Sequence, residues 1–98
     1  MRLWTKVLAF DWDTGNLHKN KLKFNVTNQE AEEVFSNEPL IVSEDKKHST
    51  KREERYQALG KTNNKRKLFL SFTIRNNRIR VISIRDMNKK EKVIYEHN

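Results

Sequence analysis

The chain has 98 residues, enough for one domain, and it contains no cysteine, which excludes disulfide bonds and thiolate zinc sites. Hydrophobic and charged residues each make up 35% of it, a polar composition that still permits a small core. No apolar run approaches the roughly 18 residues of a membrane span, and the lack of cysteine favours a reducing cytoplasm.

The charge is large and unevenly placed. The formal net charge is +8 and the isoelectric point is about 9.9. Residues 1–50 hold seven Lys and Arg against eight Asp and Glu, whereas residues 51–98 hold fourteen against five. A basic block of this size indicates a polyanionic partner, either nucleic acid or an acidic protein.

The N-terminal part predicts a strand followed by two helices. Residues 3–10 form the strand, and Asp13 or Thr14 then caps a weak helix that runs to about Lys23. Residues 27–30 read Thr-Asn-Gln-Glu, a capping box that predicts the start of a second helix. This helix presents Ala31, Val34 and Phe35 at helical spacing, and Asn37 and Pro39 end it.

The rest of the chain predicts strands and a closing helix. Residues 67–74 alternate regularly, with large apolar side chains on one face and Ser71 and Thr73 on the other. Residues 44–54 are charged and predict a long hairpin loop, and Asn76-Asn77 predicts a tight turn. The expected strands are Leu40–Val42, Arg55–Gly60, Lys67–Ile74 and Arg78–Arg85.

The closing helix is expected over Met87–Glu96, with Asn88 as its cap, Glu91 three residues on, and Val93, Ile94 and Tyr95 packing it down. Consecutive strands with short links pair antiparallel. The sequence therefore predicts one α+β domain over residues 1–98, with an antiparallel sheet of about four strands.

The sequence lacks the residues that most kinds of catalytic centre require. Glycine occurs only twice, which excludes a glycine-rich phosphate loop, and no serine has a glycine-framed motif. The three histidines, His18, His48 and His97, lie far apart in the sequence, and no spacing suggests a metal site. We therefore expect neither a metal nor a cofactor.

Arginine is the residue type that remains as a candidate for catalysis. A guanidinium holds a phosphate with two parallel hydrogen bonds, and RNA supplies its own nucleophile in the 2′-hydroxyl. In a regular strand Arg80 and Arg85 would point to opposite faces, so they share a site only if a bulge intervenes or the strand ends early. His48, Tyr95 or a lysine could move the protons. The alternative is that both arginines are structural and pair with Glu53, Glu54 or Asp86.

Four blocks of residues resemble the BrnT family of ribonuclease toxins from bacterial toxin–antitoxin pairs. They span roughly residues 8 to 96 in the family's order. They are Phe10-Asp11-Trp12-Asp13-Thr14-Gly15-Asn16 with Lys19 and Lys23, Glu30-Ala31 and Val34-Phe35 with Pro39-Leu40, Asp45-Lys46-Lys47-His48-Ser49 with Glu54-Arg55-Tyr56 and Ala58-Leu59-Gly60, and Ile79-Arg80-Val81-Ile82-Ser83-Ile84-Arg85 with Lys90-Glu91 and Tyr95.

The resemblance implies a RelE-like toxin fold, with helices on one face of the sheet and a basic, RNA-facing surface on the other. It implies metal-independent cleavage of RNA that inhibits translation, with Arg80, Arg85, Arg55, His48 and Tyr95 as candidate site residues. It also implies a BrnA-type antitoxin with a ribbon-helix-helix domain, an assembly of two toxins and two antitoxins, and contact with operator DNA only through the antitoxin.

Two other hypotheses remain open at this point. The basic surface could belong to a binding module without catalysis, for RNA, DNA or an acidic antitoxin face. The second hypothesis is a decayed toxin, because this chain has Phe24 where family members usually have His, and Ile84 where a small Ala is common.

Overall fold

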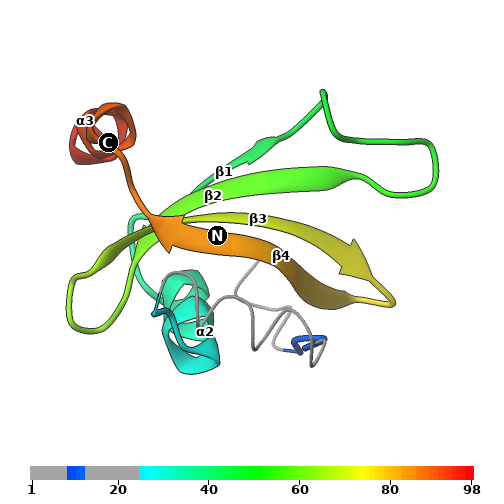
Figure 1. Cartoon of the computed structure of the whole chain (residues 1–98), viewed down its shortest axis with the longest axis horizontal. Helices are drawn as coiled ribbons and strands as arrows, with labels where there is room; N and C mark the ends of the chain where they lie inside the picture. The colour runs from blue at the N-terminus through cyan, green and yellow to red at the C-terminus, as the bar shows by residue number, and fades with distance from the viewer. Residues whose placement is uncertain (1–8, 13–24) are drawn as a thin grey trace.

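A four-stranded antiparallel sheet forms the centre of the structure, a computed structural model that describes residues 9–12 and 25–98. The sheet order is β1-β2-β3-β4, so each strand lies beside the next one in the chain (Figure 1). This confirms the predicted α+β class and antiparallel sheet. The strands are β1 (Ile41–Glu44), β2 (Arg55–Lys61), β3 (Lys67–Arg75) and β4 (Arg78–Asp86).

The links between the strands follow the sequence signals. Asn76 and Asn77 have φ angles of 51° and 63°, a left-handed conformation that asparagine tolerates, and they close the β3–β4 hairpin. The charged segment 45–54 is the predicted loop between β1 and β2. The predicted turn and this long loop are thus both confirmed.

Helix α2 (Asn28–Ser36) begins at the predicted capping box. The Thr27 hydroxyl accepts a hydrogen bond from the Glu30 backbone N–H at 3.1 Å, and the Glu30 carboxylate accepts one from the Thr27 N–H at 3.0 Å. Ala31, Val34 and Phe35 are buried against the sheet, as their spacing predicted. Figure 1 shows α2 below the sheet.

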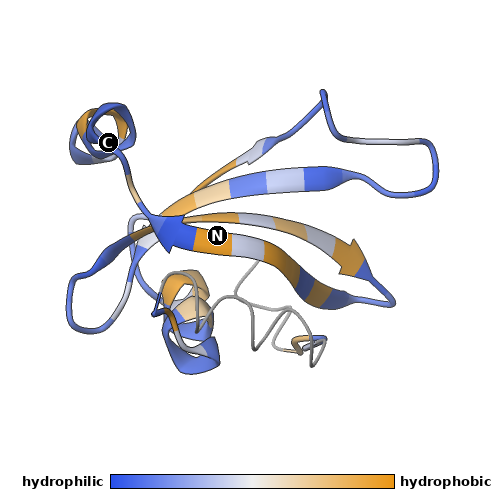
Figure 2. Ribbon diagram, viewed as in Figure 1, coloured by the Kyte–Doolittle hydropathy of each residue, from blue (hydrophilic) through white to orange (hydrophobic). Residues whose placement is uncertain are grey.

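The side of the sheet that faces α2, the core face, carries the hydrophobic core. Apolar bands alternate with polar ones along β3 and β4 (Figure 2). The rings of Phe35 and Phe72 meet edge to face with centroids 5.2 Å apart, which joins helix to sheet. The fully buried apolar cluster consists of Val26, Ala31, Val34, Phe35, Ala58, Leu68, Leu70, Phe72, Ile79, Val81 and Ile84.

A β-bulge in β4 changes which side chains share a face. Phe72 lies opposite Val81 and Ser71 opposite Ser83, so Ile82 is an extra residue between them. Val81 and Ile84 therefore both reach the core. Arg80 and Arg85 consequently share the other side of the sheet, the open face. Its side chains include Ile41 and Ser43 in β1, Arg55, Gln57 and Leu59 in β2, Phe69, Ser71 and Thr73 in β3, and Arg80, Ser83 and Arg85 in β4.

Helix α3 (Lys89–Glu96) stands beyond one end of the sheet, away from α2 (Figure 1). Asn88 and Glu91 form the predicted capping box. Tyr95 is buried, but Val93 and Ile94 are 55% and 46% exposed, so the prediction that all three pack the helix down was wrong for these two. Consecutive helical residues point about 100° apart, so the burial of Tyr95 leaves Val93 and Ile94 pointing in other directions.

The N-terminal predictions lie largely outside the described residues. The strand expected over residues 3–10 is described only at its end, where Phe10 forms a parallel bridge with Ile79. The Ile79 N–H donates to the Ala9 carbonyl at 3.0 Å, and the Asp11 N–H donates to the Ile79 carbonyl at 2.8 Å. The helix expected between Asp13 and Lys23 lies outside the described residues altogether.

Candidate functional site

Two of the predicted arginines meet in one row across the open face. Arg55 in β2 lies opposite Thr73 in β3, and Thr73 lies opposite Arg80 in β4. Neighbouring strands are about 4.8 Å apart, so two strand spacings separate the arginine backbones by about 10 Å. Guanidinium groups on long side chains can converge on one anion across that distance.

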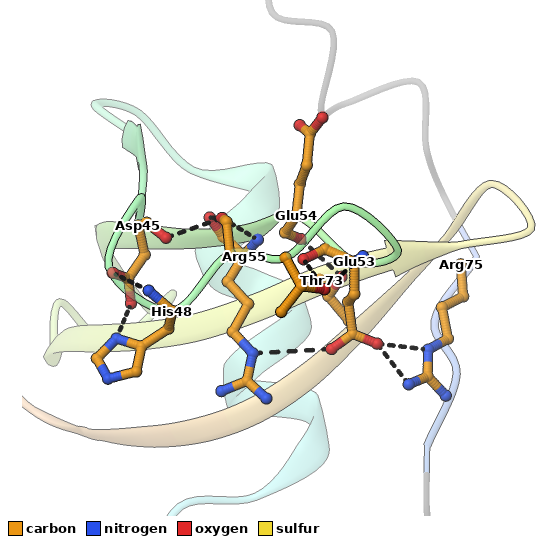
Figure 3. A network of polar contacts seen from close by, with 9 residues as sticks. Asp45, His48, Glu53, Glu54, Arg55, Thr73 and Arg75 are labelled. Atoms are coloured by element: carbon orange, nitrogen blue, oxygen red, sulfur yellow. Dashed lines mark hydrogen bonds and ion pairs between the residues drawn. The ribbon is translucent and has the colours of Figure 1, made fainter.

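A carboxylate, Glu53, lies between Arg55 of this row and Arg75 (Figure 3). Glu53 accepts a hydrogen bond from Arg75 Nε at 3.0 Å, and its other oxygen lies 3.7 Å from Arg55 Nε. The hydrogen bond from Arg75 lowers the pKa of Glu53 against the opposing effect of burial, and the charges of Arg55 and Arg80 lower it further. Glu53 is therefore ionised at neutral pH.

Arg80 has a second acidic neighbour, because its Nη1 lies 3.5 Å from Asp11 Oδ2. Neither Glu53 nor Asp11 cancels the charge of the group, since the three arginines Arg55, Arg75 and Arg80 face two carboxylates. The row together with Arg75 thus keeps net positive charge at partly exposed side chains, which suits a phosphate.

His48 lies beside this row on the β1–β2 loop and is held by Asp45 (Figure 3). Its Nδ1 is 2.8 Å from Asp45 Oδ2, and its backbone N–H donates to the Asp45 carbonyl at 3.2 Å. Burial raises the pKa of the Asp45 carboxyl, but the hydrogen bond and charge of His48 outweigh this and lower it. A carboxylate at Nδ1 favours the tautomer with its proton there, so Nε2 is left able to accept a proton.

The loop that carries His48 is built by short side-chain bonds. Ser49 Oγ donates to the Asp45 carbonyl at 2.8 Å and accepts from the Arg55 backbone N–H at 2.8 Å. Thr73 Oγ1 donates to the Glu54 carbonyl at 2.8 Å. These bonds fasten both ends of the loop to the sheet and set the position of His48 relative to Arg55.

A hollow of about 250 Å³, the site hollow, joins these groups to the middle of the open face. Asp45, His48 and Arg55 line one end of it. Its remaining lining is formed by Gln57, Phe69, Ser71, Ile82 and Ser83. The bulged residue Ile82 therefore contributes to the site as well as to the register.

Arg85 lies on the same face but is already engaged. Its two terminal nitrogens donate to the two oxygens of Glu91 at 2.8 and 2.9 Å, and its guanidinium carbon lies 4.2 Å from the centroid of the Phe69 ring. The hydrogen bonds that Arg85 donates to Glu91 raise the pKa of Arg85 and lower that of Glu91. Arg85 therefore links β4 to α3. Its carboxylate partner is Glu91, whereas the sequence offered Glu53, Glu54 and Asp86 as candidates.

Tyr95 is separated from the other candidates. Its hydroxyl donates to the Pro39 carbonyl at 2.7 Å, and burial raises its pKa. The structure thus brings together His48, Arg55 and Arg80, places Arg85 farther along the same face, and gives Tyr95 a packing contact.

Sequence reasoning missed Asp45 as a functional residue and considered Glu53 only as a partner of Arg80 or Arg85. The available signal was local, since Asp45 stands three residues before His48 in a turn, and Glu53 stands two residues before Arg55. The Ile84 departure also has a structural reading, because that side chain is 1% exposed within the core and does not reach the open face.

The described residues contain neither a metal-binding cluster nor a membrane-spanning helix. No three His, Asp or Glu side chains converge there as a metal-binding group would. None of the described helices is both long enough and apolar enough to cross a membrane.

Comparison with known protein families identifies what this chain is similar to. The sequence model of a family described as "Ribonuclease toxin, BrnT, of type II toxin-antitoxin system" matches residues 12–91. No curated protein matches the chain. The matched segment contains His48, Arg55, Arg80 and Arg85, whereas Tyr95 lies beyond it.

Proposed function

The chain belongs to the BrnT family of ribonuclease toxins of type II toxin-antitoxin systems, and we propose that it cleaves RNA where His48 meets the arginine row. The observation that carries this assignment is the placement of Arg55 and Arg80 in one row beside a histidine held by Asp45. Together these groups supply an anion-binding surface and a proton acceptor.

In the proposed reaction the 2′-oxygen of a ribose attacks the adjacent phosphorus, and the bond from phosphorus to the 5′-oxygen breaks. His48 Nε2 takes the 2′-hydroxyl proton and then gives it to the departing 5′-oxygen, leaving a 2′,3′-cyclic phosphate and a 5′-hydroxyl. Arg55 and Arg80 hold the phosphodiester and stabilise the negative charge that grows on its oxygens. No metal ion is needed in this scheme, because RNA carries the nucleophile and arginine supplies the positive charge.

The test is inducible expression of the toxin alone in a bacterial host, followed by growth and by the integrity of total RNA. We expect the parent to arrest growth and degrade RNA, and Arg55→Ala, Arg80→Ala and His48→Ala to lose about 100-fold or more of the cleavage rate measured with purified protein. Arg52→Ala is the matched control, because Arg52 is an exposed loop arginine. Full toxicity in soluble, folded Arg80→Ala protein would refute the assignment.

A binding module without catalysis is the alternative, and the pairing of Arg80 with Asp11 and of Arg55 with Glu53 favours it. It predicts RNA binding that weakens steeply with salt, with no cleavage product under any condition. Cleaved RNA from purified parent protein, absent from the His48→Ala variant, would exclude it.

Membership of the family implies an antitoxin partner. We propose that the partner is a BrnA-type ribbon-helix-helix protein, that two toxins bind two antitoxins in the cytoplasm, and that operator DNA contacts only the antitoxin. The net charge of +8 supports an acidic contact surface on that partner. Co-expression followed by mass measurement of the purified complex tests the stoichiometry, and residues 1–98 should fold as the single toxin domain of that complex.

A further inference from the structure

A row of uncharged polar side chains crosses the whole open face next to the arginine row. Ser43 lies opposite Gln57, Gln57 opposite Ser71, and Ser71 opposite Ser83. The arginine row lies two residues away along the strands, which corresponds to about 7 Å. Three members of this polar row, Gln57, Ser71 and Ser83, line the site hollow.

Two serine hydroxyls of this row are available to a ligand. Among the residues that the structure describes, no side-chain hydrogen bond engages Ser71 or Ser83, although both are half-buried. The Gln57 side chain hydrogen-bonds to the Asp45 carboxylate and helps to lower the pKa of that carboxyl, and the rest of its amide can still bind a ligand. Half-buried polar groups usually have a partner, and a hollow that contains two hydroxyls without one suits a polar, uncharged ligand surface.

A flat platform stands at the far end of the same hollow. The Arg85 guanidinium lies 4.2 Å from the centroid of the Phe69 ring, and both bonds to Glu91 hold it in that position. Phe69 lines the site hollow and also the neighbouring hollow of about 340 Å³ under α3. Unpaired nucleobases are recognised on such surfaces, by stacking on aromatic rings and guanidinium planes and by hydrogen bonds to their edges.

We propose that the site hollow binds the nucleobase adjoining the cleaved phosphate, with Gln57, Ser71 and Ser83 hydrogen-bonding its edge and the Phe69–Arg85 pair packing against it. This proposal rests on the proposed function, because the arginine row must hold the phosphate for the base to reach the polar row. It assigns Arg85 a role in base recognition, since Glu91 already neutralises its charge.

The experiment measures RNA binding and cleavage on four short single-stranded RNAs that differ only in the base next to one cleavage site. A matched set with a 2′-O-methyl group at that site cannot be cleaved and reports binding alone. We expect the parent to prefer one base by about tenfold, the value of one good pair of hydrogen bonds. In Gln57→Leu this preference should shrink toward equality, while the weaker bases are bound as before.

A second variant at Gln57 and a control variant show whether an effect comes from the base site or from loss of the folded structure. Gln57→Glu keeps the size of the side chain but replaces an amide donor by an acceptor, so it should change which base is preferred. Ser71→Ala and Ser83→Ala should reduce the preference in part, and Ser36→Ala, an exposed serine on α2, should leave it unchanged. All variants should unfold near the parent's midpoint.

The outcomes separate the two proposals. If Arg80→Ala weakens binding of all four RNAs equally and Gln57→Leu changes only the preference, both hold. If the parent distinguishes bases in binding but cleaves none, the proposed function fails and the base site stands. A parent without base preference, an equal loss for all four bases in Gln57→Leu, or an effect of Gln57→Leu on antitoxin binding alone would overturn the base site.

Discussion

Thr73 shows how one buried hydroxyl joins the sheet to the loop that carries His48. It is 1% exposed and lies between Arg55 and Arg80 in the arginine row. Its hydroxyl donates to the Glu54 carbonyl at 2.8 Å, one residue before β2 begins. The position of the β1–β2 loop therefore depends on a hydrogen bond from β3, the strand that lies between β2 and β4.

Replacing Thr73 tests this dependence directly. Thr73→Val keeps the shape but removes the donor and leaves the partly buried Glu54 carbonyl without this bond, which should lower the free energy of unfolding by about 1–2 kcal/mol. Cleavage should fall as well, because the loop positions His48. Thr73→Ser keeps the hydroxyl and should retain most of the activity. Urea unfolding and the cleavage rate measure both effects, and a Val variant as active and stable as the parent would contradict the argument.

Among single residues, the sequence predicted some members of the site and missed others, and the reasons are physical. Arg80 was predicted from the arginines placed within a strand, His48 as a group that could move protons, and Arg55 from one of the blocks that resemble a family pattern. Arg85 and Tyr95 lie in or near the same blocks, but their partners, Glu91 and Pro39, depend on where α3 sits against the sheet. Helical periodicity in eight residues does not fix that position.

The bulge in β4 is the structural feature on which the shared face of Arg80 and Arg85 depends. Alternation predicted the strand and showed that a bulge would be needed for the two arginines to share a face. Its place at Ile82 follows from packing, because both Val81 and Ile84 must reach the core. The sequence alone offers Ile79, Val81, Ile82 and Ile84 as equally apolar choices, so it could not locate the extra residue.

The contact between α2 and β2 depends on a glycine. A Cβ placed on Gly60 would lie 2.5 Å from Val34 Cγ1, closer than real carbon atoms approach, and 3.4 Å from the Val34 carbonyl oxygen. Valine in a helix has essentially one side-chain rotamer, so it cannot turn away. The sequence predicted Gly60 as the end of a strand and gave no sign of this close approach.

Gly60→Ala should therefore destabilise the protein by about 1–3 kcal/mol through overpacking, even though alanine suits a strand better than glycine. Combining it with Val34→Ala removes the obstructing methyl groups, so the double variant should lose less stability than the two single losses added together. Thermal or urea unfolding of the four proteins gives this coupling. Strictly additive losses would show that the two residues do not press on one another.

Ion pairs join segments of the molecule that lie far apart in the sequence. Arg66, just before β3, donates to Asp86 at the end of β4 at 2.7 Å and lies 3.2 Å from Glu30 in α2. Lys67 pairs with Glu96 in α3. The sequence showed the basic excess of the C-terminal half but not these partners, since pairs 20 to 36 residues apart depend on the sheet order.

The stability of the whole molecule should consequently decrease in acid. Hydrogen bonds from Arg66, Arg85 and Arg75 lower the pKa values of Asp86, Glu91 and Glu53. A folded-state pKa below the unfolded value means that the stabilisation is complete above the unfolded value, near 4, and is lost as the pH falls through the folded value. The net charge of +8 rises further in the same range, which adds repulsion.

We expect the thermal midpoint, followed by circular dichroism, to be nearly constant from pH 7 to pH 5 and to fall steadily between pH 4 and pH 2. Asp86→Asn should lower the midpoint at pH 7, with a loss of about 0.5–1 kcal/mol because the pair is largely exposed, and should flatten the acid limb. Glu44→Gln, which removes a carboxylate from the exposed edge strand, is the matched control and should leave the profile unchanged. A parent midpoint that is the same at pH 7 and pH 3 would show that these pairs do not stabilise the fold. A salt titration completes the argument, because added salt at pH 7 should reduce the difference between the parent and Asp86→Asn as it screens the pair.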